Sequence, residues 1–293
     1  MKKYRFGLFA FLIVLLLMPI GHALMILNEG LFKEFKLEGA FIIGLLGAVA
    51  LVFGVRKNAN KSLASIMGLL GGVLIWTGWV EFSFVWIAEK NDVQPLIENG
   101  SVATKPEYLI MMSSLGLLST ILLFFIFSST RCQFFKWFQQ ILHIRKQFKE
   151  DNAKHKLIAI ITFIETIVLL WTFYIVLLLV YDKDIAGDKH PATYIVAFGS
   201  LFWSVYLFIN LLKINTYDYA IRYAVPTVII FWNFIEVIGR WNLLKEIWVH
   251  PFEHARENGI ILILLLAFVS YYFYENHKLA RFKHNEHLRN AIK

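Results

Sequence analysis

The chain has one cysteine and six prolines among 293 residues, and charged residues make up only 17% of it. Because a lone cysteine cannot form an internal disulfide, Cys132 excludes a fold built on disulfide bonds. Only Pro19 and Pro226 lie inside apolar runs, so the matched pair of broken half-helices that marks many secondary transporters is missing. The sequence also lacks a P-loop, a G-x-G-x-x-G turn, a G-x-S-x-G elbow and a C-x-x-C pair.

Apolar residues dominate what is present. They make up 58% of the chain and the mean hydropathy is +0.59, whereas soluble domains are roughly 45–50% apolar. A helical membrane crossing needs about 20 residues, so we predict an all-α integral membrane protein, with residues 1–293 forming one polytopic domain of about eight transmembrane helices. The predicted spans lie near residues 7–27, 40–55, 63–88, 108–128, 157–181, 193–212, 220–244 and 258–275.

Lysine and arginine are unevenly distributed over the connections between these spans. With the N-terminus inside, the inner connections hold 20 of the 29 basic residues and the outer ones hold 9. The positive-inside rule therefore predicts that both termini are cytoplasmic. The net charge of +8 then reflects topology and contact with anionic lipid, not a nucleic-acid-binding surface. The basic start and the short loops indicate the inner membrane of a bacterium, although the first span also fits a cleavable signal peptide.

Two inner segments have a composition of their own. Residues 130–156 interleave aromatic and aliphatic side chains with lysine and arginine, which predicts an amphipathic helix in the inner headgroup region or, alternatively, an ordinary basic loop. Residues 276–293 predict a basic cytoplasmic tail that extends the last helix. In the second and third spans, small-residue spacings such as Gly44 with Ala48 predict close contact between helix backbones.

Glutamates inside the predicted spans indicate function. An ionisable side chain there costs at least about 2.5–3.5 kcal/mol, so Glu81, Glu165 and Glu236 each mark a candidate site. With a rise of about 1.5 Å per residue, Glu81, Glu236 and His22 lie roughly 27, 24 and 22 Å above the inner edge. We expect these three side chains to share a layer in the outer half of the membrane, whereas Glu165, roughly 12 Å up, lies apart.

The stretch EIWVHPFEH follows the outer end of the seventh predicted span. Its H-x-x-E-H spacing places His250 and His254 four residues apart, as in one class of zinc hydrolases. Pro251 disfavours helical geometry at His250, and the large soluble domain that carries this motif in those enzymes is missing, so chance spacing is the alternative. Pro251 suits the first turn of the eighth helix, which would place the motif above the glutamate layer.

Imidazole and carboxylate ligands together suit zinc, iron or manganese. We therefore predict a divalent metal site and no other cofactor, with five ligand candidates: His22, Glu81, Glu236, His250 and His254. In this hypothesis Glu253 acts as a catalytic base or orients a ligand, and Arg240 holds an anionic group of the substrate. Tryptophans near Glu81 and Glu236 fit either an interfacial belt or the wall of an apolar pocket.

These patterns predict a metal-dependent membrane enzyme, a hydrolase or an oxidase, that acts at the outer, periplasmic leaflet on a lipidic or apolar substrate. Two alternatives stay open. A proton- or cation-coupled transporter or channel would use Glu81, Glu165 and Glu236 as a titrating ladder, and a non-catalytic subunit of a larger complex would use them in salt bridges to partner helices. The expected partners are membrane lipids, with a second copy of the chain or another membrane subunit left open.

Overall fold

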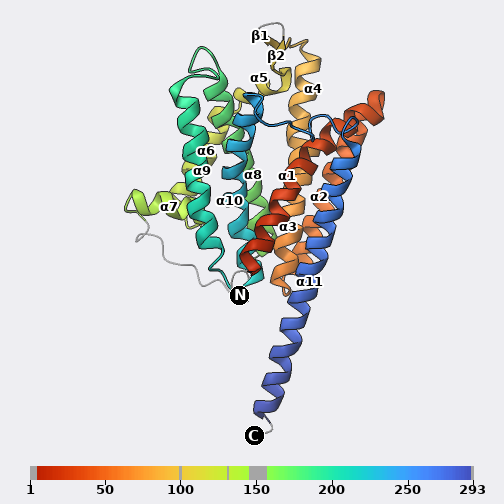
Figure 1. The fold of residues 1–293 in the computed structure, drawn as a ribbon, viewed down its shortest axis with the longest axis vertical. Helices are drawn as coiled ribbons and strands as arrows, with labels where there is room; N and C mark the ends of the chain where they lie inside the picture. Colours follow the sequence, from red (N-terminus) through yellow and green to blue (C-terminus); the bar gives the residue numbers. More distant parts are fainter. Residues whose placement is uncertain (1–4, 99–100, 131, 145–156, 292–293) are drawn as a thin grey trace.

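The computed structural model describes residues 5–98, 101–130, 132–144 and 157–291 (Figure 1). These residues are predominantly helical, and the one sheet found among them is a hairpin of β1 (Leu96–Glu98) and β2 (Ser101–Thr104). Six helical segments are long and apolar enough to cross a membrane, or seven if one bent pair counts as a span. The prediction of a predominantly helical fold is confirmed, and the number of long apolar helices supports a multi-pass membrane protein.

The first of these segments contains two helices. A short 3-10 turn (Lys33–Phe35) joins α1 (Arg5–Phe32) to α2 (Lys36–Arg56), and Lys33 has a φ of 40°. Across the turn, Asn28 Nδ2 donates to the carbonyl of Lys36 at 2.8 Å. Figure 1 shows α1 rising to this turn, from which α2 runs back along the bundle.

The remaining helices follow in chain order. A π-helical segment, η3 (Trp76–Glu81), interrupts the third long helix between α3 (Lys61–Ile75) and α4 (Phe82–Lys90). The bent pair, with an angle of 51°, consists of α5 (Pro106–Met112) and α6 (Leu115–Ile126). The others are α7 (Gln133–Ile141), α8 (Ile158–Tyr181), α9 (Pro191–Leu211), α10 (Tyr217–Arg240) and α11 (Ala255–Ala291).

Glycines allow α2 to pack closely and antiparallel against α3 and η3. A Cβ atom added at Gly47 would lie 2.9 Å from the backbone nitrogen of Ile75, and one added at Gly78 would lie 2.4 Å from that of Gly44. Contacts this short leave room only for hydrogen, so the helix backbones lie next to each other, as the small-residue spacing predicts. The contact brings the η3 segment, with Glu81 at its end, against α2.

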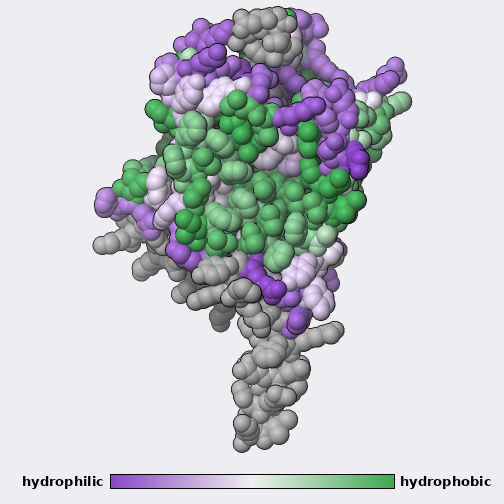
Figure 2. Space-filling model, viewed as in Figure 1, coloured by the Kyte–Doolittle hydropathy of each residue, from purple (hydrophilic) through white to green (hydrophobic). Residues whose placement is uncertain are grey.

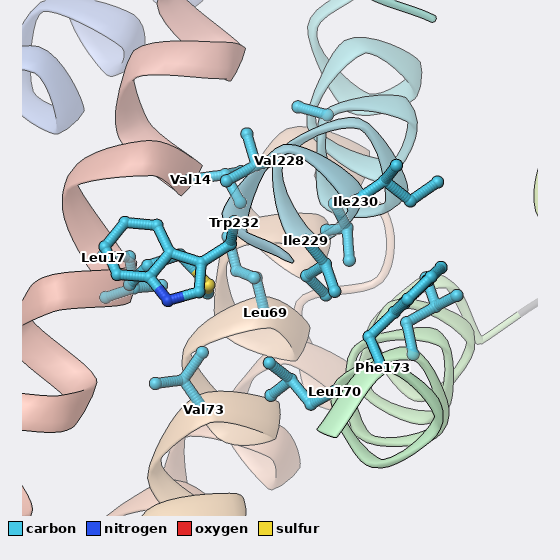
Figure 3. Packing of buried hydrophobic residues seen from close by; sticks show 14 of the residues in the cluster. Val14, Leu17, Leu69, Val73, Leu170, Phe173, Val228, Ile229, Ile230 and Trp232 are labelled. Atoms are coloured by element: carbon cyan, nitrogen blue, oxygen red, sulfur yellow. The ribbon is translucent and has the colours of Figure 1, made fainter. Parts of the chain in front are cut away.

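The core of the bundle forms around α10, which packs against α1, α3, α8 and α9. Figure 3 shows Val228, Ile229, Ile230 and Trp232 of α10 among side chains of its neighbours, with further labelled residues Val14, Leu17, Leu69, Val73, Leu170 and Phe173. The buried faces of α1, α8 and α10 therefore meet along the centre of the protein. This arrangement determines which polar side chains of those helices come together.

Figure 2 shows hydrophobic residues in a band across the middle of the molecule, with hydrophilic residues above it and at its lower edge. The short helix α7 lies across the bundle (Figure 1) and buries Phe134 and Phe135. Gln139 fixes it, because its Nε2 donates to the carbonyls of Ile126 (2.9 Å) and Ser128 (2.8 Å). Residues 131 and 145–156 of the predicted amphipathic segment, and 292–293 of the predicted tail, lie outside the described residues.

Candidate functional site

A cavity of about 230 Å³ lies between α1, α8 and α10, at the end of the bundle that carries the β-hairpin. Its walls also include the connection from β2 to α5 and the connection that follows α10. Most of the wall is apolar or aromatic, and α8 contributes aliphatic side chains together with Phe173 and Tyr174. Polar groups are few, so their positions define the chemistry of the cavity.

His22 of α1 and Glu236 of α10 face each other in the cavity wall. The Nε2 atom of His22 lies 3.5 Å from Oε1 of Glu236 and 3.4 Å from the hydroxyl of Tyr174. The same Glu236 oxygen accepts a hydrogen bond of 2.6 Å from Nε1 of Trp232. The side chains of His22 and Glu236 are 21% and 26% exposed, so both are largely removed from the surface while still open to the cavity.

The local sequence explains how this pair forms. Trp232 and Glu236 are one helical turn apart on α10, so the indole N–H reaches the carboxylate along the same face. The ring of His22 stacks on Trp232 with centroids 6.0 Å apart, and Trp232 in turn packs against Trp248 at 5.0 Å. Gly21, next to His22, lets α1 approach Val73 of α3. Aromatic packing thus positions the imidazole, and a hydrogen bond positions the carboxylate.

Arg240 also lines the cavity, one turn beyond Glu236, and contacts Asp188 and Tyr181. Its Nε donates to Oδ1 of Asp188 at 2.5 Å, and its guanidinium lies 4.3 Å from the ring centroid of Tyr181. Glu236 and Arg240 are four residues apart on one helix, a spacing that allows an ion pair, but the structure instead joins Arg240 to the turn between α8 and α9. The positive charge therefore stays at the cavity wall next to an acidic partner.

Two further charged side chains, Lys105 and Glu246, line the cavity. Lys105 lies 3.8 Å from Glu107 and is 48% exposed. Glu246, in the connection after α10, is half-buried, and burial raises its pKa to about 7. The negative charge of Glu236 raises this pKa further, whereas His250 lowers it. Glu246 is therefore a carboxyl group that titrates near neutral pH at the cavity.

The other two membrane glutamates lie away from the cavity wall. Glu81, at the end of η3, is 6% exposed, and it interacts electrostatically with Tyr108 and Tyr174 of the wall. Glu165 lies in α8 and is 7% exposed. Neither is among the described residues that line the cavity, so Glu81 stands behind the aromatic wall and Glu165 stands apart from it.

The H-x-x-E-H stretch lies just before α11. The backbone N–H of His254 donates to the carbonyl of His250 at 3.0 Å, so one helical turn forms after Pro251. His250 and Glu253 are exposed, and Nδ1 of His254 lies 3.8 Å from Oε2 of Glu257. Within the described part of the chain no three His, Cys, Asp or Glu side chains gather as a metal site, and of the five ligand candidates His22 and Glu236 come together.

Several site residues carry no signal in the sequence. Tyr108 and Tyr174 lie in apolar helices where an aromatic residue is ordinary, and Asp188 and Glu246 lie in polar connections. Their proximity arises from tertiary packing across more than fifty residues, as between Asp188 and Arg240. The number of residues from the end of a span predicts the depth of a side chain in the membrane, but not which face of the helix is turned inward.

The arrangement supports proton transfer in an apolar chamber. The Glu236 carboxylate accepts a hydrogen bond from Trp232 and lies close to Nε2 of His22. It therefore favours a proton on Nε2, which leaves Nδ1 as the basic atom of the imidazole ring. Such a pair acts as a general acid or base when a reacting group lies within hydrogen-bond distance. Comparison of the chain with protein-family models, curated proteins and solved structures gave no match.

Proposed function

We propose that the protein is a membrane-embedded enzyme that acts at the outer leaflet on a lipidic or otherwise apolar molecule held in this cavity. The observation that carries the proposal is the His22–Glu236 pair, 3.5 Å apart, in a wall that is otherwise largely apolar and aromatic. Placing an acid–base pair in such a wall costs free energy, so its presence indicates a functional role more than a structural one. Perturbed polar groups in a cavity are a general mark of catalytic sites.

We propose a topology of eight spans with both termini in the cytoplasm of a bacterial cell, and the inner membrane as the location. As one straight helix, the 52-residue segment Arg5–Arg56 would be about 78 Å long, against a hydrocarbon core of about 30 Å. Two spans, α1 and α2, account for its length, and α5 with α6 supplies one more. In Figure 1, α1 begins and α11 ends at the same end of the bundle, opposite the β-hairpin, which supports placing both termini on one side of the membrane.

In the proposed reaction His22 and Glu236 transfer a proton to or from the reacting group. Tyr174, 3.4 Å from His22 Nε2, orients the imidazole, and Trp232 orients the carboxylate. Arg240 lies at the same wall beside Asp188, and we propose that its positive charge attracts an anionic group of the substrate. The role of Glu253 as a base stays a prediction, since this side chain is exposed and is not among the described residues that line the cavity.

Metal dependence is part of the proposal that needs its own test. A zinc, iron or manganese ion bound by His22 and Glu236 would need further ligands, because structural and catalytic sites use three or four protein donors. Elemental analysis of the purified protein after mild chelation tests this directly. Near-stoichiometric metal that is lost in His22→Gln supports the metal-dependent reaction, whereas full activity without bound metal supports acid–base catalysis by the pair.

The test of activity uses the full chain reconstituted into vesicles of bacterial lipid extract, with lipid products followed by mass spectrometry. We expect the wild type to convert a lipid component and Glu236→Gln to lose roughly 10²–10⁴-fold in rate, the usual contribution of a general acid or base. Glu34→Gln is the matched control, because Glu34 is exposed in the turn after α1. Equal rates in the wild type and in Glu236→Gln would refute the proposal, and Glu253→Gln tests the predicted base.

One observation favours a second function, a proton- or cation-coupled pathway. Glu165 is 7% exposed within α8, at a depth where the proposed enzyme does not use it. A transporter would need Glu165 as well as Glu81 and Glu236. Flux measurements with Glu165→Gln in vesicles separate the two functions, because the enzyme proposal expects lipid conversion to continue in that variant.

A further inference from the structure

A second cavity, of about 130 Å³, lies between the short helix α7 and the helices α9 and α10 (Figure 1). Its lining includes Trp137 of α7, Trp203 of α9 and Pro226 of α10. Pro226 precedes Glu236 by ten residues on α10, so the two cavities lie about 15 Å apart along that helix. The second cavity is therefore separate from the site of the His22–Glu236 pair.

Aromatic rings form much of its wall. The ring of Trp203 stacks on Phe134 with centroids 5.8 Å apart and lies 5.0 Å from the ring of Trp137, so aromatic packing holds α7 against α9. Trp137 is 39% exposed and Tyr206 is 60% exposed, so part of the ring surface stays open beside the cavity. Aromatic side chains of this kind favour a flat ring that stacks on them or meets them edge to face.

The polar groups of the lining carry no charge. Asp, Glu, Lys, Arg and His are all missing from the described residues that line this cavity. In the part of the chain that the structure describes, the indole N–H groups of Trp137 and Trp203 and the amide of Gln140 have no hydrogen-bond partner. An indole N–H is a donor only. The lining therefore matches a neutral ligand that carries acceptor oxygens, and it offers nothing to a phosphate or an ammonium ion.

The volume and surroundings of the cavity limit the rest of the ligand. A cavity of about 150 Å³ is known to hold benzene in another protein, so about 130 Å³ accepts one six-membered ring and excludes a fused ring system such as a sterol. On the same side of α9 as the open face of Tyr206, Phe202 and Ile209 are exposed and apolar. A tail attached to the ring would therefore extend into the bilayer.

We infer that this second cavity binds the head ring of a membrane quinone, an amphiphile with one flat neutral ring, carbonyl oxygens and an apolar tail. The ring lies against Trp137 and Trp203, and their indole N–H groups and the Gln140 amide donate to the carbonyl oxygens. The inference concerns binding alone and uses none of the residues of the His22–Glu236 site, so it goes beyond the proposed enzyme and does not depend on it.

Binding to the full chain in a non-ionic detergent provides the test, measured by microscale thermophoresis. The probes are decylplastoquinone and decylbenzene, which share the ring and tail but differ in the carbonyl oxygens. We expect the wild type to bind the quinone roughly tenfold or more tightly than the hydrocarbon. Trp203→Phe keeps a ring but removes the N–H, and Gln140→Leu removes the exposed amide; each should weaken quinone binding by about three- to tenfold and leave decylbenzene binding unchanged.

Phe202→Leu is the matched control, because Phe202 lies on α9 next to Trp203 but is 71% exposed and is not among the described lining residues. Circular dichroism of each variant shows whether the helices are retained, and Gln140→Leu alters an exposed side chain that the fold does not need. We expect Phe202→Leu to bind both probes as the wild type does.

Three outcomes would overturn the inference. Equal affinity of the wild type for the two probes would show a cavity that takes only hydrocarbon. A quinone preference that survives both Trp203→Phe and Gln140→Leu would place the quinone elsewhere, and a preference lost in Glu236→Gln would place it in the first cavity. Because lipid conversion plays no part in this assay, failure of the proposed enzyme reaction would leave the quinone site standing, and the reverse also holds.

Discussion

Replacing Gly78 by alanine tests the close contact between α2 and η3. The new Cβ atom would lie 2.4 Å from the nitrogen of Gly44, 2.6 Å from the oxygen of Ala40 and 2.9 Å from Cα of Gly44. These neighbours are backbone atoms and have no rotamer with which to withdraw. The two helices must therefore separate by about 1 Å before the contact reaches the roughly 3.5 Å at which non-bonded atoms pack well.

The expected cost follows from that separation. Overpacking by a single carbon typically costs about 1–3 kcal/mol when the surroundings cannot relax. For a chain of this size each kcal/mol lowers the melting temperature by roughly 2–4 °C. Gly199→Ala is the matched control, since a Cβ there meets nothing within 4 Å. In that variant the better helix propensity of alanine stabilises by about 0.5–1 kcal/mol at most.

Cys132 supplies the assay. It is the one cysteine of the chain and is 4% exposed, and burial raises the pKa of its thiol well above the usual value. A thiol-reactive fluorophore therefore reports loss of the fold during heating at a fixed rate, with helical circular dichroism as a second readout. We expect Gly78→Ala to unfold several degrees below the wild type and Gly199→Ala to unfold at the wild-type temperature or slightly above it. Equal unfolding temperatures for the two variants would refute the close contact.

Two more predictions concern Glu246 and Gln139. Because the folded-state pKa of Glu246 is about 7 against 4.5 for the free side chain, its protonation stabilises the fold below pH 4.5 and this contribution disappears as the pH rises through 7. Glu246→Gln should therefore melt progressively higher than the wild type between pH 5 and pH 8, and a difference independent of pH would contradict the shift. Gln139→Leu removes the donor to the Ser128 carbonyl, which should destabilise the packing of α7 by about 1–3 kcal/mol. Cys132 should therefore react faster with the thiol-reactive fluorophore at 25 °C. An unchanged labelling rate would show that other contacts hold α7.

The helical membrane fold follows from the sequence because its causes are local. Backbone groups inside a bilayer must satisfy their hydrogen bonds within the helix, so an apolar run of about 20 residues is sufficient to predict a span. The turn at Lys33–Phe35 falls in the connection predicted between residues 27 and 40, but it is much shorter than predicted, because α1 continues to Phe32 and α2 begins at Lys36. No local sequence pattern predicts the π-helical segment at Trp76–Glu81. Gly78 within it packs against α2, and that contact depends on the tertiary fold.

The candidate site is only partly visible from the sequence for a related reason. Depth along a helix is local, and it places His22 and Glu236 at similar heights, where the structure joins them. Rotation about the helix axis is set by packing, so spacing alone does not show that Glu81 stands behind the aromatic wall. The choice of Asp188 over Glu236 as the partner of Arg240 spans 52 residues and depends on where the α8–α9 turn lies.

Asp188 also fastens one side of the cavity. Its carboxylate accepts from Arg240 and its carbonyl accepts from Trp241 Nε1 at 2.9 Å, so the α8–α9 turn is bonded twice to the end of α10. On the opposite side, Lys105 is 48% exposed and meets Glu107 only at 3.8 Å, a weak contact in water. The α8–α9 side of the cavity is thus held by stronger contacts than the side at Lys105. The residence time of a bound molecule should therefore be governed by the β2–α5 connection, and changes there should alter exchange rates more than affinity.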